Sequence, residues 1–513
     1  MESRIDRRRF LGAAGVAAGA AGVAAAAAAT GDAAAAPSPA DARTPAGAAR
    51  AASVARAAAP PDGPNVLVLV LDSLRYDHVG ANGSKVKTPN IDALARESLR
   101  FTRAFPEAMP TVPARRSLLT SRRVYPWSGW KPTRNLPGSP GWTGLGSGET
   151  TWLRALRAAG WWTGYVTDNP FLGFNPSWAP LRRSVDRFMR IGGQVGALRP
   201  ASSVSLASAR HWLPRDMQTE EYVKGMRQHL ANLAGARDER EQCCARVFSH
   251  ALDVLASARR ARRPFALVVD CFDPHEPWAP VKKYRDLYLD DRYRGNEPGN
   301  VRYRPSRYLT AQELGRLPGI YAAAVTQTDA WLGHFLSKFY DAGLADSTAI
   351  VLLSDHGIVL GERGWTGKPA LELHPELIHV PLLLRSPDRR RAGQSTDYFA
   401  SPHDVGTTLL SMTGTRRPAT MNGSDLSPLL SARAPAQARP FWYGGYANHW
   451  YYRDGRFALI ADGNNRGREL FDLRKDPGER TNVARANLPL LDEIYERVLK
   501  SARLSRLPYF GRR

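Results

Sequence analysis

Cysteine is scarce in this chain and forms no recognisable metal motif. Among 513 residues there are only three cysteines, Cys243, Cys244 and Cys271, and no two of them stand in C-x-x-C spacing. Cysteine-based metal sites are therefore not expected. Two interpretations of the thiols remain, a plain structural role or one disulfide from Cys271 to either of the other two.

Acidic residues are also in short supply. The chain has 48 Asp and Glu against 71 Lys and Arg, which gives a formal net charge of +23. Such an excess can attract nucleic acid or an anionic envelope polymer. The basic residues are scattered, and aromatic and basic side chains are not interleaved as in nucleic-acid modules. We therefore interpret the charge mainly as a solvated surface and expect no nucleic-acid partner.

The N-terminus is typical of an export signal. Three arginines at residues 7–9 precede Phe10 and Leu11, and the next residues are almost wholly Gly, Ala and Val. This pattern resembles a twin-arginine signal, so we predict a signal peptide over residues 1–36, the export machinery as a partner, and a secreted or cell-envelope location. Residues 37–62 read as an Ala/Pro-rich linker. A retained anchor is the alternative, although this stretch would be a weak membrane span.

Apolar runs at residues 66–71, 265–269 and 348–353 indicate strands that are buried on both faces, and residues 161–167 indicate a further strand. These strands alternate with helical patterns. This alternation predicts an α/β fold over residues 63–430, with a doubly wound, mostly parallel sheet flanked by helices. We expect a short strand at residues 101–105 and an irregular insertion at 170–235. Residues 431–513 predict a small C-terminal antiparallel β-sheet plus a helix.

Polar residues follow three of these strands. Asp72 follows the first, His275 comes shortly after the third, and Asp355 and His356 follow the fourth. Ligands of open α/β sheets bind at the carboxyl ends of the strands, so these side chains are candidates for one site. Helix capping and loop packing are the alternatives for each of them taken singly.

Thr111 is the candidate nucleophile. It stands between Pro110 and Pro113, at the start of a run with helical spacing, where backbone N–H groups and the helix dipole favour anions. Arg115 follows one turn later and can share its face. This arrangement suits attack on a phosphate or sulfate ester, whereas an ordinary capped helix with a surface arginine is the alternative.

Four segments in the right order resemble the sulfatase family of the alkaline phosphatase superfamily. The first is residues 66–75 (VLVLVLDSLR) with 88–92 (TPNID), and the second is 111–121 (TVPARRSLLTS), which is similar to the family signature. The third is 354–357 (SDHG) with 360–362 and 367–368, which resembles the second metal motif and active-site lysine, here Lys368. The fourth is 469–473 (ELFDL) with 476–479. The resemblance covers about residues 64–485.

The departures from the family pattern bear on the chemistry. Sulfatases oxidise a signature Cys or Ser to formylglycine, but Thr111 carries a methyl group on its β-carbon and would give a ketone, so no formylglycine is expected. Ser73 and His356 stand where the family has an acid and an asparagine. The Gly-Lys-Trp-His segment of the family is replaced at residues 166–170, and Ala114 replaces a serine.

We predict one divalent metal ion, held by Asp72, Thr111, Asp355 and His356. The imidazole favours Mn, Zn or Fe, and Ca is the alternative because it prefers more oxygen ligands. A second metal would need further ligands such as Asp329 and His334, which are five residues apart and do not share a helix face. We expect only one.

These residues predict a sulfatase-family, metal-dependent hydrolase of sulfate, phosphate or phosphonate esters. The metal would activate the Thr111 hydroxyl, Arg115 and Lys368 would balance the charge of the transferring group, and His275 would protonate the leaving alcohol or bind substrate. Phosphorus esters rank above sulfate esters because a sulfothreonine needs direct hydrolysis. The substrate is a small-molecule, glycan or lipid ester. Alternatives are a phospho-group transferase acting on an envelope lipid or polymer, and a non-catalytic binding protein; the oligomeric state is open.

Overall fold

Residues 62–511 are described by a computed structural model. The signal peptide expected over residues 1–36 and the linker up to residue 61 lie outside the described residues. Within the described part, no helix is long and apolar enough to cross a bilayer. The three cysteines are buried free thiols, so no disulfide joins Cys271 to Cys243 or Cys244.

An eight-stranded sheet runs through the centre of the molecule in the order β12-β2-β11-β8-β1-β6-β4-β5. The strands from β8 to β5 are parallel, whereas β11 runs antiparallel to both of its neighbours. The sheet is therefore mostly parallel, as expected. Its strands are β1 (Asn65–Leu71), β2 (Leu99–Phe101), β4 (Trp162–Thr167), β5 (Arg187–Arg190), β6 (Phe265–Cys271), β8 (Thr348–Leu353), β11 (Leu382–Arg385) and β12 (Ser395–Thr396).

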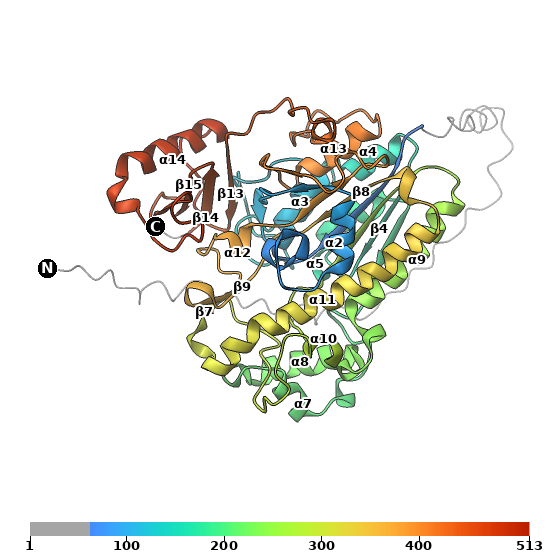
Figure 1. Cartoon of the computed structure of the whole chain (residues 1–513), viewed down its shortest axis with the longest axis vertical. Coiled ribbons are helices and arrows are strands. Elements are labelled where there is room, and N and C mark those ends of the chain that lie inside the picture. The colour runs from blue at the N-terminus through green and yellow to red at the C-terminus, as the bar shows by residue number, and fades with distance from the viewer. Residues whose placement is uncertain (1–61, 512–513) are drawn as a thin grey trace.

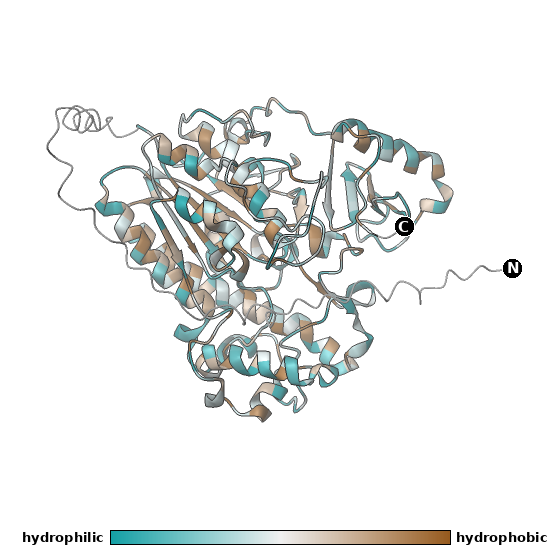
Figure 2. Cartoon of the chain, turned by 180° about the vertical axis from the view of Figure 1, so that it is seen from behind, coloured by the Kyte–Doolittle hydropathy of each residue, from teal (hydrophilic) through white to brown (hydrophobic). Residues whose placement is uncertain are grey.

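Helices cover both faces of this sheet because its central strands are apolar on both sides. In β1, Leu67 and Leu69 pack toward one face, whereas Val66 and Val68 pack toward the other. The first face is covered by α2 (Pro89–Arg96), α9 (Cys243–Arg260) and α11 (Ala311–Asp341), and the second by α3 (Thr111–Thr120), α4 (Trp152–Ala158) and α13 (Asp404–Met412). Figure 1 shows these two layers, and Figure 2 shows the apolar colouring of the strands between them.

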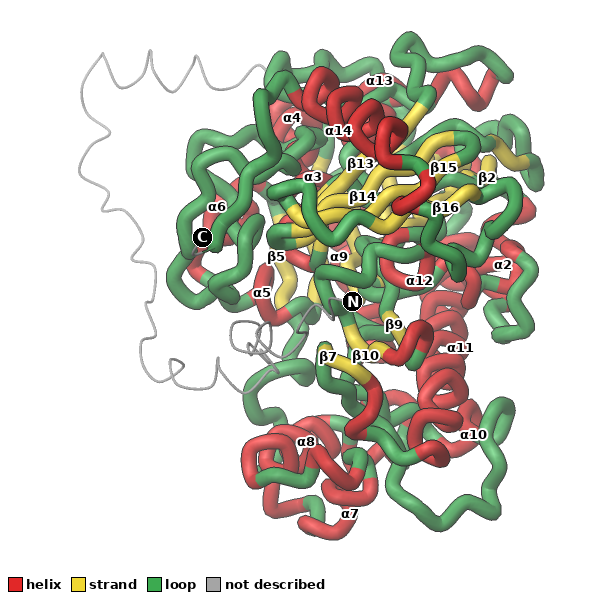
Figure 3. Tube along the Cα trace, turned by 90° about the vertical axis from the view of Figure 1, so that its left-hand side faces the viewer, coloured by secondary structure: helices red, strands yellow, loops and turns green. Residues whose placement is uncertain are grey.

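The C-terminal part forms a second, smaller sheet, which also pairs with the strand just before Thr111. The antiparallel strands β13 (Phe441–Tyr446), β14 (His449–Asp454), β15 (Phe457–Asp462) and β16 (Glu469–Asp472) are packed against α14 (Leu488–Ala502), as Figure 3 shows. The short strand β3 (Ala108–Met109) joins β13 in parallel. Since β3 immediately precedes Pro110 and α3, this sheet fixes the approach of the chain to Thr111.

Two local expectations are wrong. Residues 170–235 are not irregular, because they contain α5 (Pro170–Gly173), α6 (Ala179–Ser184), α7 (Leu206–His211) and α8 (Glu220–Asn232). In α8, Val223, Met226 and Leu230 are spaced three and four residues apart and are buried. The strand expected at residues 101–105 is β2, which ends at Phe101; beyond it only an isolated bridge pairs Ala104 with Ala400.

Candidate functional site

The strand order places four polar strand ends side by side. β8, β1, β6 and β4 are consecutive neighbours, and all run parallel. Their carboxyl ends therefore lie at the same edge of the sheet, where Asp355, Asp72, Asp270 and Asp168 are found. All four side chains are buried, so a dense group of carboxylates lies at this edge.

Thr111 is the first residue of α3 and points its hydroxyl at this group. Its side chain is 2% exposed, and Oγ1 lies 3.4 Å from Nε2 of His356. Pro113 falls in the first helical turn, where its missing N–H costs no hydrogen bond. The sequence expectation that Thr111 starts a helix beside the strand ends is thus met in the geometry.

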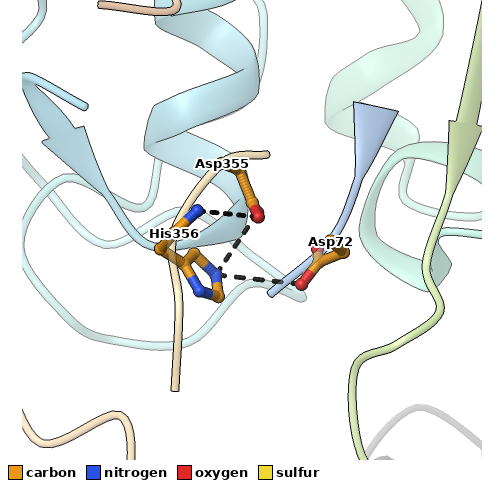
Figure 4. Close-up of side chains that lie close together, drawn as sticks. All are labelled: Asp72, Asp355 and His356. Carbon is orange, nitrogen blue, oxygen red and sulfur yellow. Dashed lines mark hydrogen bonds and ion pairs between the residues drawn. The ribbon is translucent and has the colours of Figure 1, made fainter. Parts of the chain in front are cut away.

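Asp72, Asp355 and His356 come together as a compact ligand group (Figure 4). One ligand atom from each of the three lies within 4.8 Å of the other two, and within residues 62–511 this is the one such group of three. Nε2 of His356 lies 3.3 Å from Oδ2 of Asp355 and 3.9 Å from Oδ1 of Asp72. Burial and the neighbouring Asp355 raise the pKa of Asp72, because two buried carboxylates repel each other.

The remaining contacts of these residues fit a bound cation. Nδ1 of His356 lies 2.9 Å from the carbonyl oxygen of Gly357, which places the proton on Nδ1 and leaves the Nε2 lone pair facing the carboxylates. Burial lowers the pKa of His356 to about 4, so the ring is neutral at neutral pH. Oδ2 of Asp72 is fully buried yet accepts no hydrogen bond. These donors suit a divalent metal, and Thr111 Oγ1 lies in position to join them.

Arg115 holds the carboxylates together from the protein side. It is fully buried, and its Nε and Nη2 donate to Asp270 at 3.2 and 2.7 Å. Its Nη1 donates to Asp355 and lies 2.9 Å from Oδ2 of Asp72, in an ion pair without hydrogen-bond alignment. Burial disfavours the charged guanidinium, but Asp270, Asp355 and Asp72 more than offset this and raise the pKa of Arg115 well above its ordinary value.

A second polar group contains Lys368 and His275. Lys368 is 2% exposed, so a solvated surface lysine is excluded, and its Nζ lies 3.1 Å from Nε2 of His275. Nδ1 of His275 donates to the backbone oxygen of Glu276. Burial lowers the pKa of His275 to about 3, and the Lys368 charge adds to the effect. The ring is therefore neutral and has its free lone pair directed at Lys368.

Lys368 and the ligand group belong to one site. Burial raises the pKa of Asp72 and lowers the pKa of His356. The nearby Lys368 charge acts on both groups and lowers the pKa of each. The seven residues that the sequence proposed are thus brought to one edge of the sheet. They are Asp72, Thr111, Arg115, His275, Asp355, His356 and Lys368.

Asp168 lies in the segment 166–170 that departs from the family pattern, and it binds a backbone N–H of the chain. It lies at the end of β4, and its Oδ1 accepts from the N–H of Phe272 at 2.7 Å. Its Oδ2 accepts from Gln194, which also donates to Asp273. Burial and the nearby Asp273 raise the pKa of Asp168 to about 8. The loop that carries His275 is therefore anchored by buried acids.

Asp329, the acid considered for a second metal, caps a helix. Its carboxylate accepts from the backbone N–H of Ile91 at 2.8 Å and of Asn90 at 3.2 Å, at the start of α2. No group of three metal-type ligands around Asp329 exists within residues 62–511.

Sequence reasoning missed three residues of this site. Asp270, Glu276 and Tyr303 contact Arg115 or Lys368, yet none was proposed. Asp270 left a signal, since it is a lone acid inside an apolar strand, and Glu276 lies between two prolines beside His275. Tyr303 left none, because its partners are 27 and 65 residues away in the chain.

Carboxylate and imidazole ligands beside a hydroxyl at a helix start suit metal-assisted attack on an ester, and they lie where ligands of open α/β sheets bind. The sequence profile described as Sulfatase matches residues 64–415, and the profile of the N-sulphoglucosamine sulphohydrolase C-terminal region matches residues 361–503. The chain belongs to the sulfatase family, whose members are ester hydrolases.

Known relatives align over most of their length. The chain is 27% identical to the multifunctional alkaline phosphatase superfamily protein PehA of Trinickia caryophylli, over 82% of this chain and 91% of that protein. It is 23% identical to an arylsulfatase of Clostridium perfringens, over 82% and 90%. The phosphonate monoester hydrolase SpPMH from Silicibacter pomeroyi has the same fold, with a TM-score of 0.65 at 20% identity, over 85% and 95%.

Proposed function

We propose that this protein hydrolyses singly charged phosphonate, phosphodiester or sulfate esters, through a Thr111 nucleophile at a single divalent metal. The observation that carries the proposal is the position of Thr111. Its Oγ1 lies 3.4 Å from Nε2 of His356, beside Asp72 and Asp355. The relatives include a phosphonate monoester hydrolase and arylsulfatases, which supports this range of substrates.

The metal would be held by Asp72, Asp355, His356 and the oxygen of Thr111. When bound, such an ion lowers the pKa of the hydroxyl and polarises a non-bridging oxygen of the ester. Imidazole among the ligands favours Mn, Zn or Fe over Ca. Arg115 keeps Asp355 ionised: burial alone would raise the pKa of that carboxyl, but the Arg115 charge and the hydrogen bond from the Ser73 N–H hold it below its ordinary value.

The reaction then proceeds in two displacements. Thr111 releases its hydroxyl proton to solvent, and Oγ1 attacks phosphorus or sulfur as the bond to the leaving oxygen breaks, so that a covalent threonine ester forms. Lys368 donates a proton to the leaving oxygen, because His275 is neutral and carries its proton on the far nitrogen. Water then attacks the threonine ester and gives one proton to the Lys368 amine, while Thr111 Oγ1 leaves and takes a proton back from solvent.

The charges around the site favour substrates with one negative charge. Four buried carboxylates, of Asp72, Asp270, Asp355 and Glu276, face only two cations, Arg115 and Lys368. A divalent ion balances the two excess negative charges, and no positive charge is left over for a dianion. Sulfate esters, phosphonate monoesters and phosphodiesters carry one charge each, whereas a phosphate monoester carries two near neutral pH.

A panel of esters with one common aryl leaving group tests this proposal. The purified protein, loaded with each of Mn²⁺, Zn²⁺ and Ca²⁺ in turn, is assayed on an aryl sulfate, phosphonate monoester, phosphodiester and phosphate monoester. We expect turnover of a singly charged ester, and a loss of about 10³-fold or more in kcat for Thr111→Ala. Unchanged activity of Thr111→Ala, or a preference for the phosphate monoester, contradicts the proposal.

Transfer to an alcohol is the second candidate, because it shares the covalent step. Product analysis in the presence of added glycerol separates the two reactions: hydrolysis releases the free acid, whereas a transferase gives the glycerol ester. In both reactions the phosphoryl, phosphonyl or sulfuryl group is first bound to Thr111 as an ester. Mass spectrometry of acid-quenched protein should therefore find this group on the peptide that contains residues 111–115.

A further inference from the structure

Lys368 is held by the carboxylate of Glu276 and the phenol of Tyr303, and neither residue has a role in the mechanism proposed above. Its Nζ lies 2.9 and 2.8 Å from the two carboxylate oxygens of Glu276 and 2.9 Å from the hydroxyl of Tyr303. The Tyr303 hydroxyl in turn donates to Glu276. Glu276 is 5% exposed, so this ion pair is screened little by solvent.

We propose that Glu276 and Tyr303 are positioning residues that aim one N–H of Lys368 at the leaving oxygen of the substrate. An ammonium group has three hydrogens. Glu276 and Tyr303 take up two directions, and the third N–H is directed at Nε2 of His275 at 3.1 Å, which is the longest of these contacts and the one that the leaving oxygen of a bound ester would replace. This inference rests on the proposed function, since it assumes that Lys368 is the proton donor.

The local backbone is built to keep this arrangement. Tyr303 directly precedes β7 (Arg304–Pro305), which pairs with β10 (Trp365–Gly367), and Lys368 follows β10 immediately. Gly367 has a φ of +77°, and a Cβ there would lie 2.1 Å from the Tyr303 ring. Only glycine at this position allows the phenol to lie across the strand and reach Lys368 and Glu276.

Lys368 and Tyr303 in turn keep Glu276 ionised. Burial favours the neutral acid, but the Lys368 charge, with hydrogen bonds from Lys368 and Tyr303, lowers the pKa of Glu276 to about 2. Glu276 is therefore an anion, and it pairs with Lys368 in a buried place. Tyr303 as a whole is 41% exposed, although its hydroxyl is held by Lys368 and Glu276.

The test is the dependence of kcat/KM on the basicity of the leaving group, measured with a series of substituted aryl esters. Proton donation matters most for basic leaving groups and hardly at all for 4-nitrophenol. Lys368→Ala sets the reference. Glu276→Gln and Tyr303→Phe should each lose about 100-fold with phenyl esters but only about threefold with the 4-nitrophenyl ester, within the usual range for general acids.

Glu297→Gln is the matched control. Glu297 is a 4%-exposed carboxylate that accepts from Arg316 of helix α11 and has no hydrogen bond or ion pair with Lys368. We expect it to leave the leaving-group dependence unchanged. A purely structural role of Glu276 and Tyr303 predicts an equal loss for all leaving groups, and that result overturns the proposal.

The outcomes separate this inference from the proposed function. If Thr111→Ala removes activity but Lys368→Ala leaves the leaving-group dependence unchanged, the positioning proposal fails and the nucleophile stands. If Thr111→Ala retains full activity, the proposed function itself fails. Should Glu276→Gln not fold, Tyr303→Phe decides, because its partly exposed ring is retained and only the hydroxyl is lost.

Discussion

Arg115 has a different task from the one that its position in the sequence indicates. We expected it to balance charge on the transferring group, yet Nε, Nη1 and Nη2 all donate to groups of the chain itself. It neutralises the acids at the strand ends and so lets Asp72, Asp270 and Asp355 occupy one buried place. Its effect on a substrate is therefore indirect, through the geometry of the ligand group.

Asp270 should be worth more to stability than its neutral neighbour Tyr165. Asp270→Asn removes the charge that faces two nitrogens of a fully buried guanidinium, and breaking one side of a buried pair costs about 3 kcal/mol. Tyr165→Phe removes only the 2.8 Å hydrogen bond from the phenol to Asp270, worth about 1 kcal/mol. Urea unfolding at neutral pH measures both, and equal losses would contradict the view of Asp270 as the main counterion.

Among the elements, the segment between β10 and α12 (Pro375–Ile378) packs against the C-terminal sheet through ionisable groups. Nδ1 of His374 lies 2.8 Å from Glu479, and its Nε2 lies 3.8 Å from both Glu372 and Glu469 of β16. Burial raises the pKa of Glu372 to about 7, with Glu469 adding to the effect and His374 opposing it. The packing of this segment should therefore depend on pH.

The sign follows from the raised pKa. Between about pH 4.5 and 7 the folded protein keeps a proton on Glu372 that the unfolded chain releases, so rising pH through this window lowers the free energy of unfolding. Glu372→Gln removes that penalty. We expect the variant to have a higher Tm than the parent at pH 8, and this gain to vanish toward pH 4.5.

Glu376→Gln serves as the control for this pH effect. Glu376 belongs to α12 and pairs with Arg363 at 2.9 Å, so its loss removes a favourable ion pair and should give no gain at pH 8. Differential scanning calorimetry of the parent and both variants at four pH values measures the effect. A gain for Glu372→Gln that is the same at every pH would contradict the assignment to its ionisation.

The elements also show what a sequence can predict. Strands β1, β6 and β8 could be read directly, because runs such as residues 66–71 are buried on both faces and have no polar interruption. The helix α8 was missed because the segment around it is rich in Pro, Gly and Arg and its own run of regularly spaced apolar residues is short. Its burial comes from tertiary contacts. The ligand residues were found because parallel strand ends meet at one edge.

The missed site residues act through contacts that have no sequence periodicity. The pair of Arg115 with Asp270 spans 155 residues, and that of Lys368 with Glu276 spans 92. Neither distance follows from helix or strand spacing; each depends on the strand order and on the course of the loop after β6. Asp168 shows the same limit, because only the structure reveals that it anchors the loop of His275.

On the scale of the whole molecule, the site gathers three distant segments. Asp72 ends β1, Thr111 starts α3 after the strand β3 of the C-terminal sheet, and Asp355 and His356 follow β8. Without a cation, the carboxylates of Asp72 and Asp355 repel each other, as the raised pKa of Asp72, due to burial and Asp355, indicates. An ion bound to all three segments should therefore stabilise the entire fold, since unfolding separates its ligands.

Metal removal should lower the stability of the whole chain. A ligand that binds only the folded state adds about 2.7 kcal/mol to the free energy of unfolding at about 100 times its Kd. We expect Mn²⁺ or Zn²⁺ added to chelator-treated protein to raise the Tm of one unfolding transition that includes both sheets. His356→Ala should lose most of that rise. His334→Ala, on the exposed side of α11, should keep it. If the parent takes up no stoichiometric metal by elemental analysis, and Tm does not respond to either ion, the ligand group does not bind a metal and the activation proposed for Thr111 fails with it.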